Sequence, residues 1–225
     1  MLLSLLIDHI AIYWSYCYYI LYTHNIDKKF YIPKLSVVYN VIVNQSIAPV
    51  MLYITNNFFN IIDFDYINNK RIDFTNFNMG IMLVILIDIF VMSIIHSIYF
   101  YIAHRMFHIN ILYKNIHYIH HRNIITLPYT AIDAHILEHI FINIFSVVCG
   151  LIIWDCHRES FIIWIWIATI SSVKTHSCII RKNSPKKHDL HHLLKHVNYG
   201  SGYKFMDKLF NTYKVYEKKN EYNKH

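Results

Sequence analysis

The chain has 225 residues, of which 55% are hydrophobic, and it carries a formal net charge of +7 and a mean hydropathy of +0.28. Soluble domains average about 45 to 50% apolar residues, so this composition favours an integral membrane protein over a soluble globular one. Nucleic-acid binding would also use positive charge, but the sequence has no recognised nucleic-acid-binding module, and we expect no nucleic-acid partner.

Three apolar runs in the first half of the chain have the length of membrane spans. Runs 1–22, 36–55 and 79–103 each reach the roughly 20 residues that a helix needs to cross the hydrocarbon core. The first run has neither a basic leader nor a small-residue cleavage site, so we expect it to remain as an anchor. A later stretch, 136–173, is interrupted by charged residues at 155–159 and predicts a hairpin of two shorter helices.

The charges of the loops predict the orientation of these spans. Three lysines fall within 28–34, whereas acidic residues outnumber basic ones within 63–73. Cytoplasmic loops are enriched in Lys and Arg. Three spans then place the amino terminus outside or in the lumen, and residues 104–135 and the basic carboxyl-terminal part, 181–225, in the cytoplasm.

Histidines are concentrated in the second half of the chain, in three motifs: HRMFH at 104–108, HYIHH at 117–121 and HDLHH at 188–192. Residues three and four apart share one helix face. One such motif alone is more often an ordinary surface or core feature, but burying all of them without partners would be too costly. Eight nitrogen donors exceed the four of a closed zinc site and suffice for two ions with open positions. The eight candidate ligands are His104, His108, His117, His120, His121, His188, His191 and His192.

Other histidines are candidates to complete the ligand set, namely His135, His139, His176 and His196. Those without a pattern are interpreted as ordinary helix or loop residues: His9, His24, His96, His157 and His225. Imidazole suits iron, zinc, copper and nickel, and a redox-active ion is required if oxygen is to be activated. Ligand type alone therefore leaves zinc open beside iron.

A rival motif, HILEH at 135–139, fits the HxxEH pattern of inverted zinc proteases, in which the glutamate is the catalytic base. A protease of this kind needs one metal site and leaves the eight histidines of the other motifs unexplained. We therefore prefer a different role for Glu138, which is to orient a ligating imidazole through its carboxylate.

In their order, these motifs resemble the fatty acid hydroxylase and sterol desaturase superfamily, whose members carry HxxxH, HxxHH and a second HxxHH. The resemblance covers about residues 95–213 and includes MDKLFNTY at 206–213. The run LYKNIHYIHHR at 112–122 is similar to sphingoid-base hydroxylases, whereas the spacing after HDLHH is closer to sterol-oxidising members.

The sequence departs from the superfamily pattern at several positions outside the three motifs. These departures bear on substrate identity and, to a lesser extent, on full activity, and they leave the eight histidines intact. Ile136 replaces the usual proline, and Cys178 and Asn211 each replace a usual glycine. Met206 replaces the usual tryptophan, and Ser97 stands where an acidic residue is common.

The resemblance implies an all-α fold, a polytopic membrane helical bundle with a cytoplasmic histidine-rich helical cap. We expect membrane-anchoring helices at 1–95, a di-metal catalytic domain at 96–215 and a basic tail at 216–225. Residence in the endoplasmic reticulum is implied by the superfamily.

The same resemblance implies a membrane-bound oxygenase that holds two iron ions and hydroxylates a lipid with molecular oxygen. The substrate would be a sphingoid base, a fatty acyl chain or a sterol, and electrons would come from cytochrome b5 or a reductase. Alternatives are a sterol desaturase or methyl oxidase of the same superfamily, a non-catalytic membrane metal-binding protein and the zinc protease.

Overall fold

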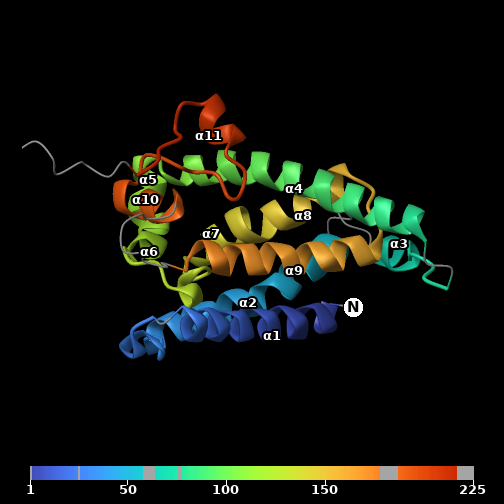
Figure 1. Cartoon of the computed structure of the whole chain (residues 1–225), viewed down its shortest axis with the longest axis horizontal. Helices are drawn as coiled ribbons and strands as arrows, with labels where there is room; N and C mark the ends of the chain where they lie inside the picture. Colours follow the sequence, from blue (N-terminus) through green and yellow to red (C-terminus); the bar gives the residue numbers. More distant parts are fainter. Residues whose placement is uncertain (1, 25, 58–63, 76–77, 178–186, 217–225) are drawn as a thin grey trace, which may run out of the picture.

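The computed structural model describes residues 2–24, 26–57, 64–75, 78–177 and 187–216, and these residues form helices and loops without a strand. The expected all-α fold is confirmed. Of the expected basic tail, 217–225 lies outside the described residues, and so does Cys178. Five longer helices run lengthwise through the molecule (Figure 1): α1 (Leu2–Thr23), α2 (Leu35–Asn57), α4 (Met79–Phe107), α8 (Phe145–Ile153) and α9 (Arg158–Thr175).

Short helices and single helical turns connect the long ones. Two π-helical turns, Tyr113–His117 and His139–Ile144, lead into α6 and α8, and two 3-10 turns occupy Lys28–Phe30 and Pro128–Thr130. Several of the short helices gather at the end of the bundle where α4 terminates (Figure 1). They are α5 (Asn110–Leu112), α6 (Tyr118–His121), α7 (Ile136–Glu138), α10 (Lys187–Leu194) and α11 (Phe205–Leu209), whereas α3 (Phe64–Asn69) lies at the opposite end, beside the α8–α9 turn.

The charged interruption of the last apolar stretch forms the turn of a helical hairpin, as the sequence predicts. Helix α8 ends at Ile153 and α9 begins at Arg158. The buried carboxylate of Asp88, on α4, accepts hydrogen bonds from Trp154 Nε1 at 2.9 Å and from the His157 backbone N–H at 3.1 Å. These bonds satisfy the polar groups of the turn and fix it against α4.

By length and apolar composition, two helical segments of the described chain qualify as membrane spans, Met79–Phe107 and Ile136–Ile153. The expected span 79–103 lies within the first of them. Residues 1–22 and 36–55 fold as helices α1 and α2, but α2 counts only as a shorter apolar helix, Leu35–Met51, and α1 does not reach the same hydropathy. Tyrosines and Asp8 lower the hydropathy of α1.

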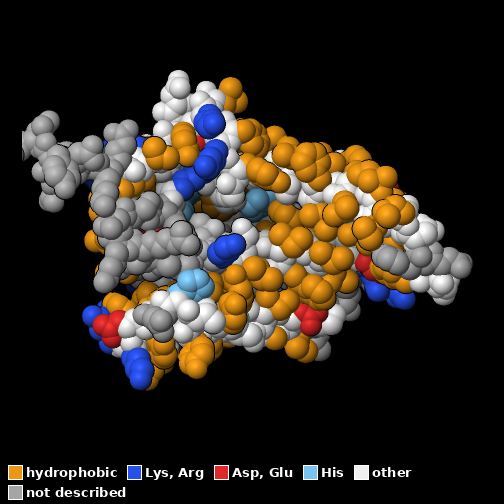
Figure 2. Space-filling view, in the orientation of Figure 1, with side chains coloured by type: hydrophobic (Ala, Val, Ile, Leu, Met, Phe, Trp, Pro, Cys, Tyr) orange, Lys and Arg blue, Asp and Glu red, His pale blue; other side chains and the backbone are white. Residues whose placement is uncertain are grey.

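Hydrophobic side chains cover much of the molecular surface over α4 and α9 (Figure 2). On α4, Leu83, Leu86 and Phe90 are 57 to 60% exposed. Soluble monomers rarely expose so continuous an apolar face, so this surface indicates association with a membrane.

Two buried clusters hold the long helices together. In α1, Tyr13, Cys17 and Ile20 lie on one helix face and pack with Val41 of α2 and Val173 of α9. The second cluster joins α4, α8 and α9 through buried apolar side chains, which include Met92, Val148, Phe161 and Trp164. At the α4–α8 contact, a Cβ at Gly150 would lie 3.0 Å from Met92 Cγ, so glycine permits the close approach of these helices.

Candidate metal centre

The histidine motifs meet at one end of the bundle, where α5, α6 and α10 pack around the end of α4 (Figure 1). His104 lies in the last turn of α4 and His108 caps that helix. The π-helical turn Tyr113–His117 precedes α6, and π turns often occur where a helix must redirect side chains at a functional site.

The first set of converging imidazoles is called the five-histidine group and consists of His104, His108, His117, His121 and His191. Their Nε2 atoms form a closely spaced chain. The distances are 3.1 Å from His104 to His117, 3.0 Å from His117 to His108, 3.2 Å from His108 to His191 and 3.1 Å from His191 to His121.

The second set, the four-histidine group, consists of His120, His176, His188 and His192. His176 Nε2 lies 3.2 Å from His120 Nε2 and 3.0 Å from His188 Nε2, and His192 Nε2 lies 3.1 Å from His188 Nε2. The two groups are adjacent, because the rings of His121 and His192 are 4.6 Å apart between centroids.

The donor spacing in both groups fits a metal ion. A nitrogen ligand lies about 2.0 to 2.1 Å from an ion such as Zn²⁺, so neighbouring ligands are separated by about 3.0 Å at right angles and about 3.4 Å in a tetrahedron. The shortest Nε2–Nε2 distances fall between these values, at 3.0 to 3.2 Å.

The other ring nitrogen of several histidines is held by a backbone carbonyl, which can only accept a hydrogen bond. His104 Nδ1–H donates to Tyr199 O at 2.7 Å, His191 Nδ1–H to Val197 O at 2.7 Å and His176 Nδ1–H to Ser172 O at 3.0 Å. Their Nε2 atoms therefore carry lone pairs that point at one another. Buried lone pairs in this arrangement repel unless a cation lies between them.

Burial also keeps these imidazoles neutral, which is the form that binds metal. It lowers the pKa of His117 and of His176 to about 3. The pKa values of His188 and His192 are lowered well below the ordinary range, first by burial and then by neighbouring histidines.

Glu138 lies beside the five-histidine group and not within a separate HILEH site. Its buried Oε2 is 2.9 Å from His117 Nδ1, in an alignment that falls short of a hydrogen bond. The two histidines of HILEH lie in neither group: His135 Nδ1 accepts from the Leu137 backbone N–H, and His139 Nδ1 is 3.3 Å from Asn143 Nδ2. His196, which is exposed, is also outside both groups.

The structure brings all eight histidines of the three motifs into the two groups and adds His176 as the ninth member. The sequence had placed His176 only among the additional candidates. Asp133 also belongs to the surroundings of the site, although the motifs did not indicate it. Its backbone carbonyl oxygen lies 3.3 Å from His120 Nδ1. Its fully buried carboxylate accepts from Arg122 and Asn123.

A cavity of about 490 Å³ reaches both histidine groups. That volume lies in the range typical of small-molecule pockets, about 300 to 1,000 Å³. Helices α1, α2, α4 and α9 contribute to its walls, where apolar side chains such as Phe100, Ile142 and Trp164 alternate with a few polar ones. The histidines that line it are His104 of the five-histidine group and His120, His176 and His188 of the four-histidine group, together with His9, His96 and His139.

Comparison with known proteins identifies similar chains. Residues 89–212, just over half of the chain, match the family model described as fatty acid hydroxylase. A fatty acid hydroxylase domain-containing protein 2 of Homo sapiens is 28% identical over 142 residues, which are 62% of this chain and 42% of that protein. Methylsterol monooxygenase 2-1 of Arabidopsis thaliana is 29% identical over 150 residues, 56% of this chain and 55% of that protein.

A very-long-chain aldehyde decarbonylase of Oryza sativa is 30% identical over 138 residues, 56% of this chain and 51% of that protein. The chain thus spans about half the length of the curated relatives that it matches. No solved structure matches it.

Proposed function

The chain belongs to the fatty acid hydroxylase family, and on that premise we propose that it is a membrane-bound oxygenase that holds two irons and uses molecular oxygen to oxidise a carbon of a lipid. The observation that carries the proposal is the pair of histidine groups that open onto one mainly apolar cavity. The names of the relatives support it, because methylsterol monooxygenases and very-long-chain aldehyde decarbonylases act on lipids.

Each histidine group would hold one iron. The chemistry supplied by the metal pair is activation of dioxygen, of which one atom enters a C–H bond of the lipid and the other leaves as water, with two electrons and two protons consumed. The chain's own residues fix the rings through the carbonyl partners of His104, His176 and His191, and they exclude water with the apolar cavity wall. A lipid carbon in the cavity can approach both groups.

We place the histidine end of the bundle in the cytoplasm, with the amino terminus on the opposite, lumenal side. The turn Lys28–Phe30 lies at the same end of the bundle as α6 and α10 (Figure 1), which brings its lysines to the histidine side. Within the proposed domains, 1–95 is more than an anchor, since Leu6 and Gln45 line the cavity of 96–215. We retain the endoplasmic reticulum as the proposed membrane.

Product analysis under ¹⁸O₂ tests the proposed function. The purified protein, loaded with iron and supplied with a reductase and a membrane lipid extract, is expected to yield a lipid heavier by one ¹⁸O atom. His120→Ala is expected to abolish that product while membrane insertion is retained, because His120 belongs to the four-histidine group and lines the cavity. Iron binding without oxygen consumption would instead indicate a metal-binding protein, and equal product from His120→Ala would contradict the ligand assignment.

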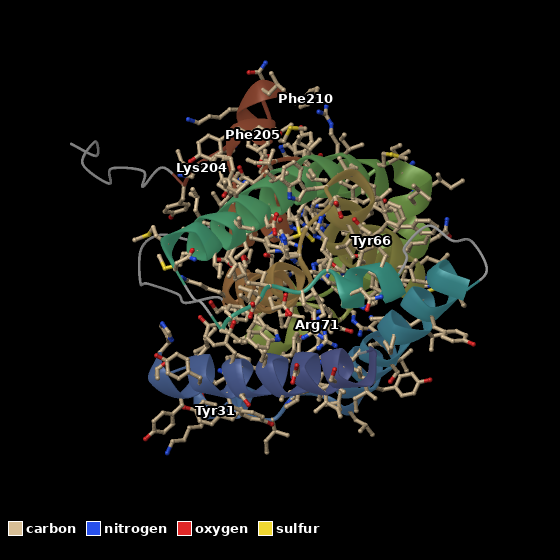
Figure 3. All side chains as sticks on the ribbon, turned by 90° about the vertical axis from the view of Figure 1, so that its right-hand side faces the viewer. Tyr31, Tyr66, Arg71, Lys204, Phe205 and Phe210 are labelled. Carbon is tan, nitrogen blue, oxygen red and sulfur yellow. The ribbon has the colours of Figure 1, made fainter. Side chains whose placement is uncertain are left out.

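Electrons would enter from cytochrome b5 or a reductase with an acidic surface, through the side of α4 that carries α11. Lys204, Phe205 and Phe210 lie on this side, away from α1 (Figure 3). Half-exposed Phe210 stacks on Tyr101 with centroids 5.3 Å apart, and Arg105 lies over both rings.

The aromatic contacts continue inward from this surface. Tyr101 contacts Tyr199, whose ring lies 5.0 Å from His108 and 5.5 Å from His191 between centroids. Lys204, at the start of α11, and Lys208, in its last turn, make this surface basic. The chain of aromatic rings connects it to the five-histidine group.

Reversing the charge at Lys204 and Lys208 together tests this entry route. In sealed microsomes, cytochrome b5 added from the cytoplasmic side is expected to reduce the metal centre about tenfold more slowly in the variant at low salt, and equally in both proteins at high salt. Dithionite, which needs no docking surface, is the control and should reduce both proteins alike. Unchanged reduction by cytochrome b5 at low salt would place the docking surface elsewhere.

A further inference from the structure

The most exposed large hydrophobic side chains of the described chain lie in the connection between α1 and α2. This connection is called the tip and consists of residues 26–35, the last of which begins α2. Ile32 is 85% exposed and Leu35 is 84% exposed, more than any other large hydrophobic residue that the structure describes. Two such side chains close together are unfavourable in water, so we expect the tip to have an apolar contact outside the chain.

The tip is also basic. It contains three lysines and one acidic residue, namely Lys28, Lys29, Lys34 and Asp27. Lys29 Nζ lies 3.1 Å from Asp27 Oδ2. Lys28 and Lys34 are exposed, and neither pairs with an acidic group of the described residues. Two positive charges that lack a partner in this part of the chain and border exposed apolar side chains match a membrane surface, in which anionic headgroups overlie acyl chains.

Exposed tyrosines surround the tip on the two helices that it connects. They lie near the end of α1 and near the start of α2, and they are 52 to 77% exposed: Tyr18, Tyr19, Tyr22 and Tyr39. Tyrosine is enriched at the boundary between hydrocarbon and water, because its ring is apolar and its hydroxyl group can remain hydrated. These tyrosines indicate that the boundary passes beside the tip, and that the tip itself lies among the headgroups.

The tip is fixed to the part of the bundle that carries the histidines. Phe30 and Tyr31 pack against the buried cluster that contains Tyr13 and Tyr129, and Tyr13 Oη donates to Tyr129 O at 2.9 Å. The tip and α6 lie at the same end of the bundle (Figure 1), and Tyr31 lies on the α1 side, away from Phe210 (Figure 3). A membrane surface bound by the tip is therefore held at a fixed height relative to the histidine groups, and it is separate from the α11 surface.

We propose that the tip is a binding site for anionic lipid headgroups of the membrane surface. Lys28 and Lys34 contact the phosphate and carboxylate groups, and Ile32 and Leu35 enter among the first acyl carbons. Figure 2 shows Lys or Arg side chains beside hydrophobic ones at the corner where α1 ends, as such a site requires. The proposal concerns the surface on which the protein rests, and it does not depend on the reaction at the metal centre.

Competition between two phospholipids tests the proposal. Phosphatidylserine and phosphatidylcholine with the same acyl chains are offered in equal amounts to the purified full chain in one detergent, and the lipids that remain bound are counted by native mass spectrometry. Each lysine near an anionic surface contributes roughly fivefold in affinity. The parent is therefore expected to favour phosphatidylserine about tenfold more than a variant that combines Lys28→Gln with Lys34→Gln. Raising the ammonium acetate concentration should diminish the preference of the parent.

Lys204→Gln with Lys208→Gln is the matched control. These two lysines are exposed, and their replacement removes the same charge from the α11 surface. This variant should keep the preference of the parent for phosphatidylserine. An equal loss of preference in the control and in the tip variant would assign the effect to the net charge of the protein and overturn a site at the tip.

Ile32→Ser with Leu35→Ser distinguishes a lipid headgroup from a free phosphate ion. The variant retains all three lysines, so a site for phosphate alone would be unaffected, whereas a lipid also loses its apolar contact. Binding of phosphatidylserine is expected to fall by about tenfold. Unchanged binding of phosphatidylserine to this variant would overturn the headgroup site.

The lipid preference itself also decides the proposal. A parent that binds both lipids equally, or a preference that survives loss of Lys28 and Lys34, would overturn it. All of these substitutions are at exposed positions, and circular dichroism checks that each variant retains the helix content of the parent. Either result leaves the proposed lipid oxidation to be decided by its own product analysis.

Discussion

Replacing His188 and His192 together by alanine is expected to lower the iron content of the purified protein from about two ions per chain to about one, and to abolish lipid oxidation. Both residues belong to the four-histidine group, which would keep only His120 and His176. Two imidazoles are too few to retain the ion, whereas the five-histidine group is untouched. Elemental analysis of the detergent-purified protein measures the loss.

The middle histidine of the same motif supplies the complementary experiment. His191 belongs to the five-histidine group, with His108 3.2 Å away. Replacing His108, His117 and His191 by alanine leaves only His104 and His121 in this group, so this variant is expected to lose the other ion. Replacing His188, His191 and His192 together should remove the ion of the four-histidine group and weaken the other, which keeps four ligands. Activity should be lost in every case, because oxygen activation is proposed to need both ions.

His196→Ala is the matched control for these variants. It removes an exposed histidine close to α10 that lies in neither group, so the iron content should remain that of the parent. A parent that holds one zinc per chain, with a zinc content that is unchanged by loss of all three α10 histidines, would contradict the two-ion centre and return attention to HILEH.

The positions of the helices could be predicted because the signals are local. Apolar runs of about 20 residues specify helices wherever they pack, and the charged interruption at 155–159 specifies the hairpin turn. Run length alone did not show that α1 is less apolar than α4, because length takes no account of the tyrosines and Asp8 that lower its hydropathy. Asparagines of α2 are the groups by which it binds the 132–134 segment.

The division of the histidines between two groups could not be predicted from spacing. His117, His120 and His121 lie within about one turn, yet His120 joins the four-histidine group and the other two join the five-histidine group. Neighbouring side chains on a helix point about 100° apart. A single helical turn that lies between the two groups can therefore supply ligands to both. Nor does local pattern reveal His176, which enters from the end of α9.

Two departures from the superfamily pattern preserve backbone geometry. Ile136 is the first residue of α7, a position that favours proline but accepts other residues. Asn211 has a φ of 55°, in the left-handed region that glycine adopts freely and asparagine tolerates better than most other residues. These positions therefore require a conformation more than a particular side chain.

A third departure preserves packing. Met206 is buried in one cluster with Tyr101 and Tyr199, so an apolar side chain still fills the site of the usual tryptophan. These contacts join residues that are far apart in the chain. Comparison of the motifs therefore showed that the residue type differs from the usual tryptophan, but not that the packing is preserved.

Asp207→Ala is expected to destabilise the protein more than any surface substitution. The carboxylate is fully buried and accepts from Lys187 Nζ at 2.6 Å, from the Gly200 backbone N–H at 3.1 Å and from Thr212 Oγ1 at 2.9 Å. Breaking a buried ion pair on one side costs about 3 to 5 kcal/mol. The side chain of Lys187 is 20% exposed and can still reach water, so about 3 kcal/mol is expected.

For a chain of this size, that loss corresponds to a melting temperature lower by on the order of 10 °C, measured in detergent by scanning calorimetry. Asp207→Asn should fall by less, because the amide oxygen can still accept from one of the neutral donors. Asp27→Ala is the control: Asp27 pairs with Lys29 at 3.1 Å on the exposed surface, where an ion pair contributes little. A melting temperature for Asp207→Ala within about a degree of the control would contradict the role of the buried pair.

The same substitution should also weaken one metal group selectively. Gly200 follows Tyr199, whose carbonyl accepts from His104, so loss of the Asp207–Gly200 bond frees the segment that orients this ligand. The four-histidine group has no contact of this kind with Tyr199, because His120 and His176 are held by Asp133 and Ser172. Partial loss of iron from Asp207→Ala is therefore expected to come from the five-histidine group, and adding His188→Ala and His192→Ala should then leave the protein with less than one iron per chain.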